Sequence, residues 1–151
     1  AAVCVTEILA SGAALLGAKA VEGLDSDAAS LVSANAEAAR LGVAVTWAEH
    51  DITNWQGRAD TVLMNPPFGA QIRGADRAFL DTAFVTAPII YTLHNANTRA
   101  FVEAYSAAAG YKVTHAWRLI FPLRHQFRHQ EKAVHEIEVI ALRLVRDAKR
   151  E

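Results

Sequence analysis

The sequence predicts a single α/β domain with a mainly parallel, Rossmann-like sheet and an antiparallel strand pair at its C-terminal end. Over the first 110 residues, apolar β-rich runs alternate with helical patterns, which is typical of a parallel sheet with crossover helices. The rhythm then changes to two long strand-like runs, residues 111–121 and 137–145, with a polar segment between them. A chain of 151 residues with 52% hydrophobic content is large enough to bury the core of one domain, here residues 1–151.

Each expected parallel strand is a short apolar run that ends at a turn or a helix signal. The fourth run stops abruptly at two prolines, because proline cannot donate a hydrogen bond to a sheet ladder. The five runs are residues 2–5, 20–24, 43–47, 61–64 and 89–93.

The helices between these strands are predicted from apolar spacing and from capping residues. The first covers about residues 8–16. Ser26 is expected to cap the second and Asp76 the third, and Asn97 or Thr98 opens the fourth. In the second helix a mostly apolar set of residues recurs at helical spacing and is followed by a C-terminal glycine. These residues are Ala28, Leu31, Val32, Asn35, Ala36, Ala39 and then Gly42.

The turn after the fourth strand, Asn65-Pro66-Pro67-Phe68, is the most informative feature of the chain. In an open α/β sheet, ligands bind beyond the carboxyl ends of the strands, where this turn lies. The Asn65 side-chain oxygen and the Pro66 carbonyl can each accept one N–H of an exocyclic amine, which turns the nitrogen lone pair toward an electrophile. Phe68 offers a flat face for a splayed-out base. The alternative is an ordinary proline-rich turn with Phe68 in the core.

Other stretches accompany the motif in a characteristic order and spacing. They are Asp60 to Gly69, Asp76-Arg77-Ala78-Phe79-Leu80, Tyr91-Thr92-Leu93-His94, Thr98-Arg99 and Ile137-Glu138-Val139. With them, nearly the whole chain resembles the methyltransferase-like protein 5 family and its archaeal relatives. The resemblance implies a class I, S-adenosylmethionine-dependent N6-adenine methyltransferase acting on RNA, with an adenosine of small-subunit ribosomal RNA as target. Asn-Pro-Pro-Phe alone also admits DNA adenine, guanine-N2 and glutamine methyltransferases.

The resemblance implies roles for several residues around the expected site. Asn65, Pro66, Pro67 and Phe68 are the catalytic residues. For the cofactor, Asp25 at the tip of the second strand matches the position that binds the ribose hydroxyls. Asp51 matches the residue that accepts from the adenine amine, with Ile52 against the ring, and Thr6 lies in the first turn. Taken singly, either acid could instead be a helix cap or a loop acid.

The family pattern fails in the first strand and turn. The resemblance requires Asp-x-Gly-x-Gly-x-Gly, but residues 1–7 read Ala-Ala-Val-Cys-Val-Thr-Glu. Val3 and Val5 would crowd the approach to the cofactor, and Glu7 would add negative charge beside its carboxylate. We therefore expect weak S-adenosylmethionine binding. The alternative function is a catalytically impaired methyltransferase-fold module that binds RNA or a partner protein. A family segment before the first strand is also expected to be missing.

A sheet edge is the expected partner surface. In the usual strand order of this fold, the third strand, from Val43 to Trp47, lies at an edge with unpaired backbone groups and carries no lysine or proline. The resemblance supplies the partner, a small zinc-binding methyltransferase activator protein. The alternative is that Trp47 packs into the core and a loop covers the edge.

Charge and histidine patterns leave alternatives open in the C-terminal part. Residues 1–110 carry 6 Lys and Arg against 11 Asp and Glu, whereas residues 111–151 carry 9 against 5. This asymmetry can mark a surface that faces RNA or simply a solvated one. A metal site is not expected, because no cysteine or carboxylate completes the histidine set by spacing. The residues concerned are His125, His129 and His135, and the basic side chains that could hold phosphates nearby are Arg124, Arg128 and Lys132.

The remaining features predict a cytoplasmic protein. Cys4 has no second cysteine with which to form a disulfide, which suits a reducing compartment. The longest apolar run, about residues 8–18, is too short to span a bilayer, and nothing at the start resembles a signal peptide.

Overall fold

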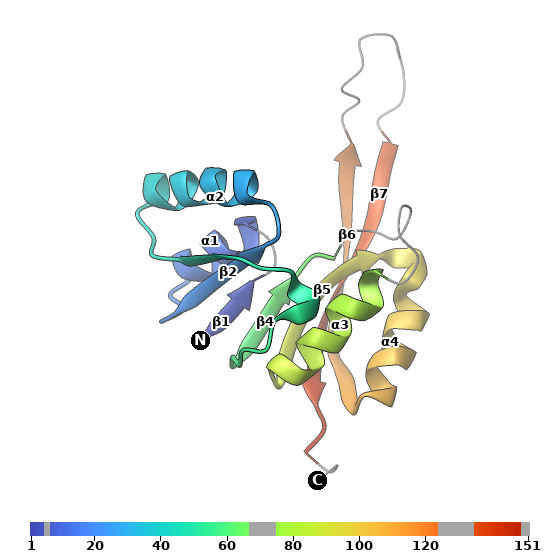
Figure 1. Cartoon of the computed structure of the whole chain (residues 1–151). Helices are drawn as coiled ribbons and strands as arrows, with labels where there is room; N and C mark the ends of the chain where they lie inside the picture. Colours follow the sequence, from blue (N-terminus) through green and yellow to red (C-terminus); the bar gives the residue numbers. More distant parts are fainter. Residues whose placement is uncertain (5–6, 67–74, 124–134, 149–151) are drawn as a thin grey trace.

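The computed structural model describes residues 1–4, 7–66, 75–123 and 135–148, and within them seven strands form one sheet (Figure 1). The strand order is β3-β2-β1-β4-β5-β7-β6. The first five strands are parallel, and β7 lies antiparallel between β5 and β6, which confirms the expected fold class. The strands are β1 (Ala2–Cys4), β2 (Val21–Asp25), β3 (Thr46–Glu49), β4 (Thr61–Met64), β5 (Ile89–Asn95), β6 (Tyr111–Leu123) and β7 (His135–Arg146).

Helices cover both faces of the sheet, with α1 and α2 on one side and α3 and α4 on the other (Figure 1). The larger part of the core lies under α3 and α4, where Leu80, Ile90 and Leu144 are fully buried. A smaller cluster around Cys4 and Ala10 lies under α1 and α2. The helices are α1 (Glu7–Leu15), α2 (Ala28–Leu41), α3 (Ala75–Thr86) and α4 (Arg99–Ala108), with short 3-10 turns η1 (Ile52–Asn54) and η2 (Ala96–Thr98). In the described part of the chain, no helix is long and apolar enough to cross a membrane.

The start and the buried face of α2 differ from the expectation. The helix is capped by Asp27, whose side chain accepts from the Ala29 N–H, and Ser26 lies one residue before the cap. The buried residues are Ala34 and Ala38, whereas Val32 is 73% exposed. Helical periodicity alone could not identify this face, because alanines recur all around the helix; the small side chains at these two positions let α2 approach the sheet.

The third strand begins three residues later than expected. Gly42 is in the left-handed region at φ 70° and donates to the Ala39 carbonyl, and Val43 donates to the Ala38 carbonyl. This C-cap motif keeps the chain at the helix end through Val43. Pairing with β2 then starts at Thr46, and β3 does lie at the edge of the sheet, as expected.

Trp47 packs into the structure over a glycine of the neighbouring strand. Gly23 pairs with Trp47 across β2 and β3, and a Cβ placed on Gly23 would lie 2.2 Å from the Trp47 ring. Such a separation is far inside van der Waals contact, so only glycine fits at this position. The Trp47 side chain is therefore a packing residue, as in the alternative interpretation of this edge.

We expect Gly23→Ala to lower the free energy of unfolding by about 1–3 kcal/mol, because the new methyl group must displace the Trp47 ring. Urea denaturation measures the change. Gly12→Ala in α1 is the matched control, since nothing lies within 4 Å of its added Cβ. Alanine there should be neutral or stabilise by up to about 1 kcal/mol. Equal effects of the two substitutions would contradict the packing of Trp47 over Gly23.

Candidate active site

A pocket of about 440 Å³ lies at the carboxyl ends of the parallel strands. The strand order reverses between β1 and β4, since β2 and β3 lie to one side and β5 to the other. Ligands of open α/β sheets bind at such a reversal, where the connecting loops leave in opposite directions. The pocket is lined by Leu24, Asp25, Ser26, His50, Asp51, Ile52, Asn65 and Phe79. It thus brings together Asp25, Asp51, Ile52 and Asn65, four of the residues singled out in the sequence.

Local hydrogen bonds hold the two pocket acids in place. Asp25 Oδ1 accepts the Asp27 N–H at 2.8 Å. Asp51 Oδ1 accepts the N–H and the hydroxyl of Thr53 at 2.9 and 2.7 Å. These bonds from Thr53 hold the pKa of Asp51 below its ordinary value, so this carboxylate is ionised at neutral pH. Each acid keeps one carboxylate oxygen that accepts no hydrogen bond from the described residues, and it can receive a donor from a ligand.

His50 ties the ends of β2 and β3 together, a role that no sequence pattern indicates. Its backbone N–H donates to the Asp25 carbonyl at 2.9 Å, and its Nδ1 lies 2.8 Å from the Asp51 carbonyl oxygen. His50 thus lines the pocket together with the two acids. Phe79, from the second turn of α3, adds an aromatic surface that only the folded chain brings into the same pocket as Asn65.

The described half of the Asn-Pro-Pro-Phe motif combines one buried and one exposed residue. Met64 ends β4 in the core, Asn65 is exposed on the pocket wall, and Pro66 is fully buried. A buried proline with a fixed φ anchors the turn, so the Asn65 amide is presented on a stiff support. Pro67 and Phe68, like Thr6, lie outside the described residues.

Val3 does not crowd the pocket as the sequence suggested. It is only 2% exposed and packs in the main core against Val62 and Ile52. Because its side chain belongs to the sheet interior, glycine at position 3 would remove core packing without widening the described pocket. Val5 lies outside the described residues, as does the side chain of Glu7.

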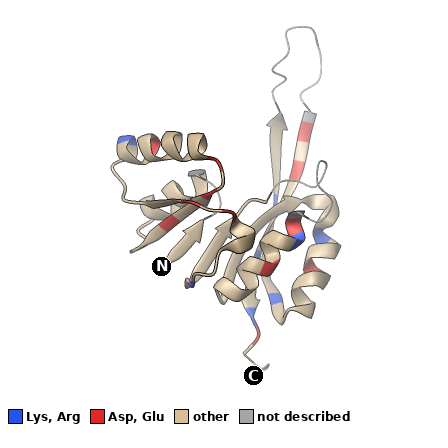
Figure 2. Cartoon of the chain, viewed as in Figure 1, with Lys and Arg blue, Asp and Glu red and all other residues tan. Residues whose placement is uncertain are grey.

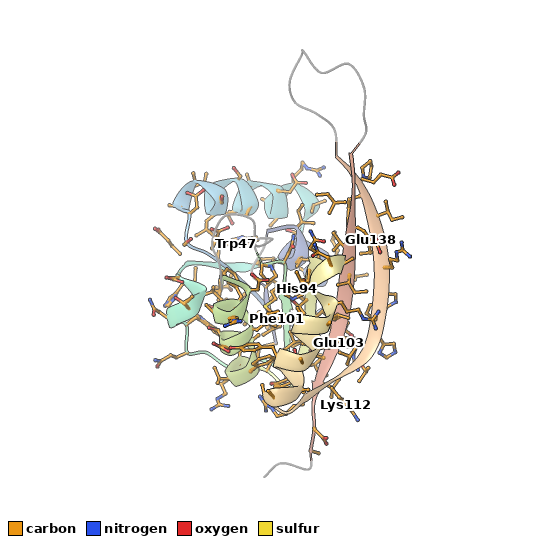
Figure 3. The ribbon with its side chains drawn as sticks, turned by 90° about the vertical axis from the view of Figure 1, so that its right-hand side faces the viewer. Trp47, His94, Phe101, Glu103, Lys112 and Glu138 are labelled. Carbon is orange, nitrogen blue, oxygen red and sulfur yellow. The ribbon has the colours of Figure 1, made fainter. Side chains whose placement is uncertain are left out.

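His94 is a buried, neutral histidine at the end of β5. It is 2% exposed, and its Nε2 lies 2.6 Å from the Thr92 hydroxyl (His94 is labelled in Figure 3). Burial lowers the pKa of His94 to about 4, although the negative charge of Asp76 acts in the opposite direction. Asp76 is the second residue of α3 and not its expected cap. Of the two interpretations of His94, the hydrogen-bonded structural histidine fits these contacts.

The other residues that the sequence analysis considered for a site form none among the residues that the structure describes. Burial raises the pKa of Cys4 to about 12, so it remains a thiol and not a nucleophile. Among the described residues, no group of His, Cys, Asp and Glu could hold a metal ion. The remaining candidates, Arg124, His125, His129, Arg128 and Lys132, lie outside the described residues, as does the side chain of His135.

Comparison with known proteins identifies relatives over most of the chain. The uncharacterized protein MJ0284 of Methanocaldococcus jannaschii is 38% identical over 153 residues, covering 93% of this chain and 70% of the relative. The rRNA N(6)-adenosine-methyltransferase METTL5 of Danio rerio is 31% identical, covering 93% of this chain and 71% of its own. No protein-family model matches the chain.

Solved structures share the fold. Protein PH1948 of Pyrococcus horikoshii superposes with a TM-score of 0.85 at 30% identity, covering 97% of this chain and 74% of that one. The magnesium protoporphyrin IX methyltransferase of Synechocystis, solved with bound SAM, gives a TM-score of 0.74 at 15% identity, over 96% of this chain and 69% of its own. This second likeness bears on the fold alone, and it is the class I methyltransferase fold.

The low pKa of His94 predicts a loss of stability in mild acid. The unfolded chain binds a proton near the ordinary pKa of 6.5 and the folded chain only near 4, so the unfolded state binds more protons between these values. Stability is complete above pH 6.5 and is lost as the pH falls toward 4. From pH 7.5 to pH 5 we expect the free energy of unfolding to fall by about 2 kcal/mol more in the unaltered chain than in His94→Gln. Equal losses in urea denaturation would contradict a buried neutral His94.

Proposed function

The chain belongs to the METTL5 family of rRNA N6-adenosine methyltransferases, and we propose that it methylates N6 of an adenosine in small-subunit ribosomal RNA. Family membership makes it an RNA methyltransferase with S-adenosylmethionine as methyl donor. The choice of adenine N6 and of ribosomal RNA belongs to our proposal. The observation that carries it is the position of Asn65 in one pocket with two strand-end acids.

The pocket residues fit the adenosyl part of the cofactor. Asp25 and Asp51 each offer a carboxylate oxygen, which suits the ribose hydroxyls and the adenine amine respectively. Leu24, Ile52 and Phe79 supply apolar surface for a flat ring. When bound, S-adenosylmethionine supplies an electrophilic methyl group.

Asn65 and Pro66 would prepare the target amine. An exocyclic amine conjugated to an aromatic ring is a poor nucleophile because its lone pair is delocalised. If the Asn65 Oδ1 and the Pro66 carbonyl each accept one N–H, the nitrogen is drawn toward a tetrahedral shape and its lone pair leaves the ring plane. No strong base is needed for this step. Buried Pro66 anchors the turn that presents the exposed Asn65 amide to the pocket.

A non-catalytic module that binds RNA or a partner protein is the second candidate. It is favoured by Val3, which fills the core at a position where the family carries a glycine of its cofactor loop. Titration calorimetry with S-adenosylmethionine separates the two candidates, because a module that has lost the cofactor shows no binding heat.

We also propose that the exposed edge of β3 binds the small zinc-binding activator protein that the family resemblance implies. Among the described residues, β3 pairs with β2 and with no other strand. Because the His50 N–H donates to Asp25 on β2, strand alternation directs the backbone groups of Ala48 toward β2 and those of Trp47 and Glu49 outward. An added strand can pair with these outward groups. The backbone of β3, and not the packed Trp47 side chain, would make the contact.

Asn65→Ala should reduce methyl transfer to adenosine by ~10²–10³, the usual cost of removing one positioned transition-state partner. The assay is radiolabelled methyl transfer to small-subunit ribosomal RNA, followed by nucleoside analysis for N6-methyladenosine. Calorimetry should find S-adenosylmethionine affinity nearly unchanged. Asn54→Ala is the matched control, because Asn54 is exposed on η1 but does not line the pocket. Unreduced N6-methyladenosine from Asn65→Ala would exclude this role.

Glu49→Pro should abolish co-purification with the activator while the domain stays folded. Proline removes one outward N–H of β3 but no bond to β2. Glu49→Ala keeps that N–H and serves as the control, which should retain the partner. Circular dichroism monitors the fold. If the proline variant retains the activator as well as the alanine variant does, the edge does not bind it.

A further inference from the structure

Arg77 and Phe101 join the first turns of α3 and α4 at the sheet edge that carries Asn65. Each is the third residue of its helix, and both helices start beyond the carboxyl end of a parallel strand. The guanidinium carbon of Arg77 lies 5.1 Å from the centroid of the Phe101 ring and 5.9 Å from that of Tyr105. The two rings stack at 5.5 Å and 22°. Arg77, Phe101 and Tyr105 thus form a cation–aromatic platform (Phe101 is labelled in Figure 3).

The charged neighbours of the platform have partners of their own. Asp81 accepts a hydrogen bond from the Tyr105 hydroxyl at 2.6 Å, and Glu103 accepts one from Arg99 at 2.9 Å. Charges of both signs lie over α3 and α4 (Figure 2). Within the described residues, the Arg77 guanidinium lies over these two rings and makes no hydrogen bond or ion pair.

The platform is accessible to a ligand. Arg77 is exposed, and Phe101 is 36% exposed. A guanidinium that lies on an aromatic ring keeps its N–H donors in its own plane, so they remain available to a phosphate or to a base edge. Its outer face is flat, and nucleobases stack on arginine planes as they do on aromatic rings.

We propose that this platform binds a nucleotide next to the target adenosine in single-stranded RNA. The proposal rests on the proposed function of the Asn65 pocket. The base of that nucleotide stacks on the guanidinium of Arg77, and its phosphate accepts the guanidinium N–H groups. Phe79, two residues after Arg77 on α3, lines the Asn65 pocket, so the first two turns of α3 carry both a pocket residue and the platform arginine, on opposite sides of the helix.

Geometry favours a single strand over a duplex. A base reaches a recessed pocket only after it leaves its stack, and its neighbours are then unstacked and need a new surface. The platform offers such a surface at the carboxyl edge of the sheet, where the pocket also lies. Every base has a flat face, so stacking depends little on the base sequence. The platform would therefore position the RNA without selecting a particular base.

The test measures binding of a short fluorescein-labelled single-stranded RNA with one central adenosine, by anisotropy, to the full chain. Arg77→Ala should weaken binding about tenfold. Arg77→Lys keeps the charge but not the flat surface, and Phe101→Leu removes the ring beneath it; both should also lose several-fold. Arg40→Ala is the control, because Arg40 is an exposed arginine paired with Glu37 on α2. It should bind RNA as the unaltered chain does.

Further readouts separate a local effect from misfolding and from failure of the proposed function. All variants should keep the S-adenosylmethionine affinity and the urea midpoint of the unaltered chain, and Arg77→Ala should raise KM for RNA with little change in kcat. Loss of RNA affinity on Arg77→Ala without methyl transfer by the unaltered chain supports the platform but overturns the proposed function. If Arg77→Ala binds RNA as tightly as Arg40→Ala does, the platform does not bind RNA. The proposal is also overturned if Arg77→Ala keeps its RNA affinity but no longer co-purifies with a protein that the unaltered chain retains.

Discussion

Parallel pairing of β1 along both of its edges is the constraint on which the rest of the structure depends. This strand has only three residues, and each of them pairs with β2 on one side and β4 on the other. Because all three strands run in the same direction, their carboxyl ends meet at one edge of the sheet. Because the chain order reverses between β1 and β4, the connections diverge there and leave a pocket. Val3, which packs inside this sheet, therefore stabilises the arrangement that forms the pocket, even though it stands where the family has a glycine.

The same edge of the sheet contains ionisable groups in two opposite environments. Asp51 is exposed, and its hydrogen bonds from Thr53 favour the charged form. His94 is buried under α3 and α4, where desolvation favours the neutral form. The pocket thus keeps fixed negative charge for ligand donors, whereas the buried face of β5 around His94 stays uncharged. As the pH falls, the fold loses stability through His94 before Asp51 is protonated. The reason is that His94 of the unfolded chain binds a proton near pH 6.5, whereas the pKa of Asp51 lies below its ordinary value of 3.8.

The two outer strands of the sheet expose different kinds of surface. β3 is short, and its largest side chain, Trp47, packs over Gly23. A partner that binds this edge would therefore contact mainly the backbone groups of β3. β6 is long and carries several exposed large apolar side chains, among them Trp117 and Phe121. Trp117 stacks with His115 at 5.5 Å and with Tyr91 at 6.5 Å.

The sequence by itself determined the elements whose signals are local. Two prolines end β4 at Met64 as expected, Gly42 closes α2 through its left-handed conformation, and the long runs of β6 and β7 pair antiparallel. It also placed Asn65, Asp25 and Asp51 at strand ends, which parallel pairing necessarily brings to one edge. Only the tertiary structure decided which alanines of α2 are buried, that Val3 is a core residue, that His94 is neutral, and that Arg77 lies on Phe101. Each of these depends on contact between segments far apart in the chain, and neither periodicity nor a capping residue carries information about such a contact.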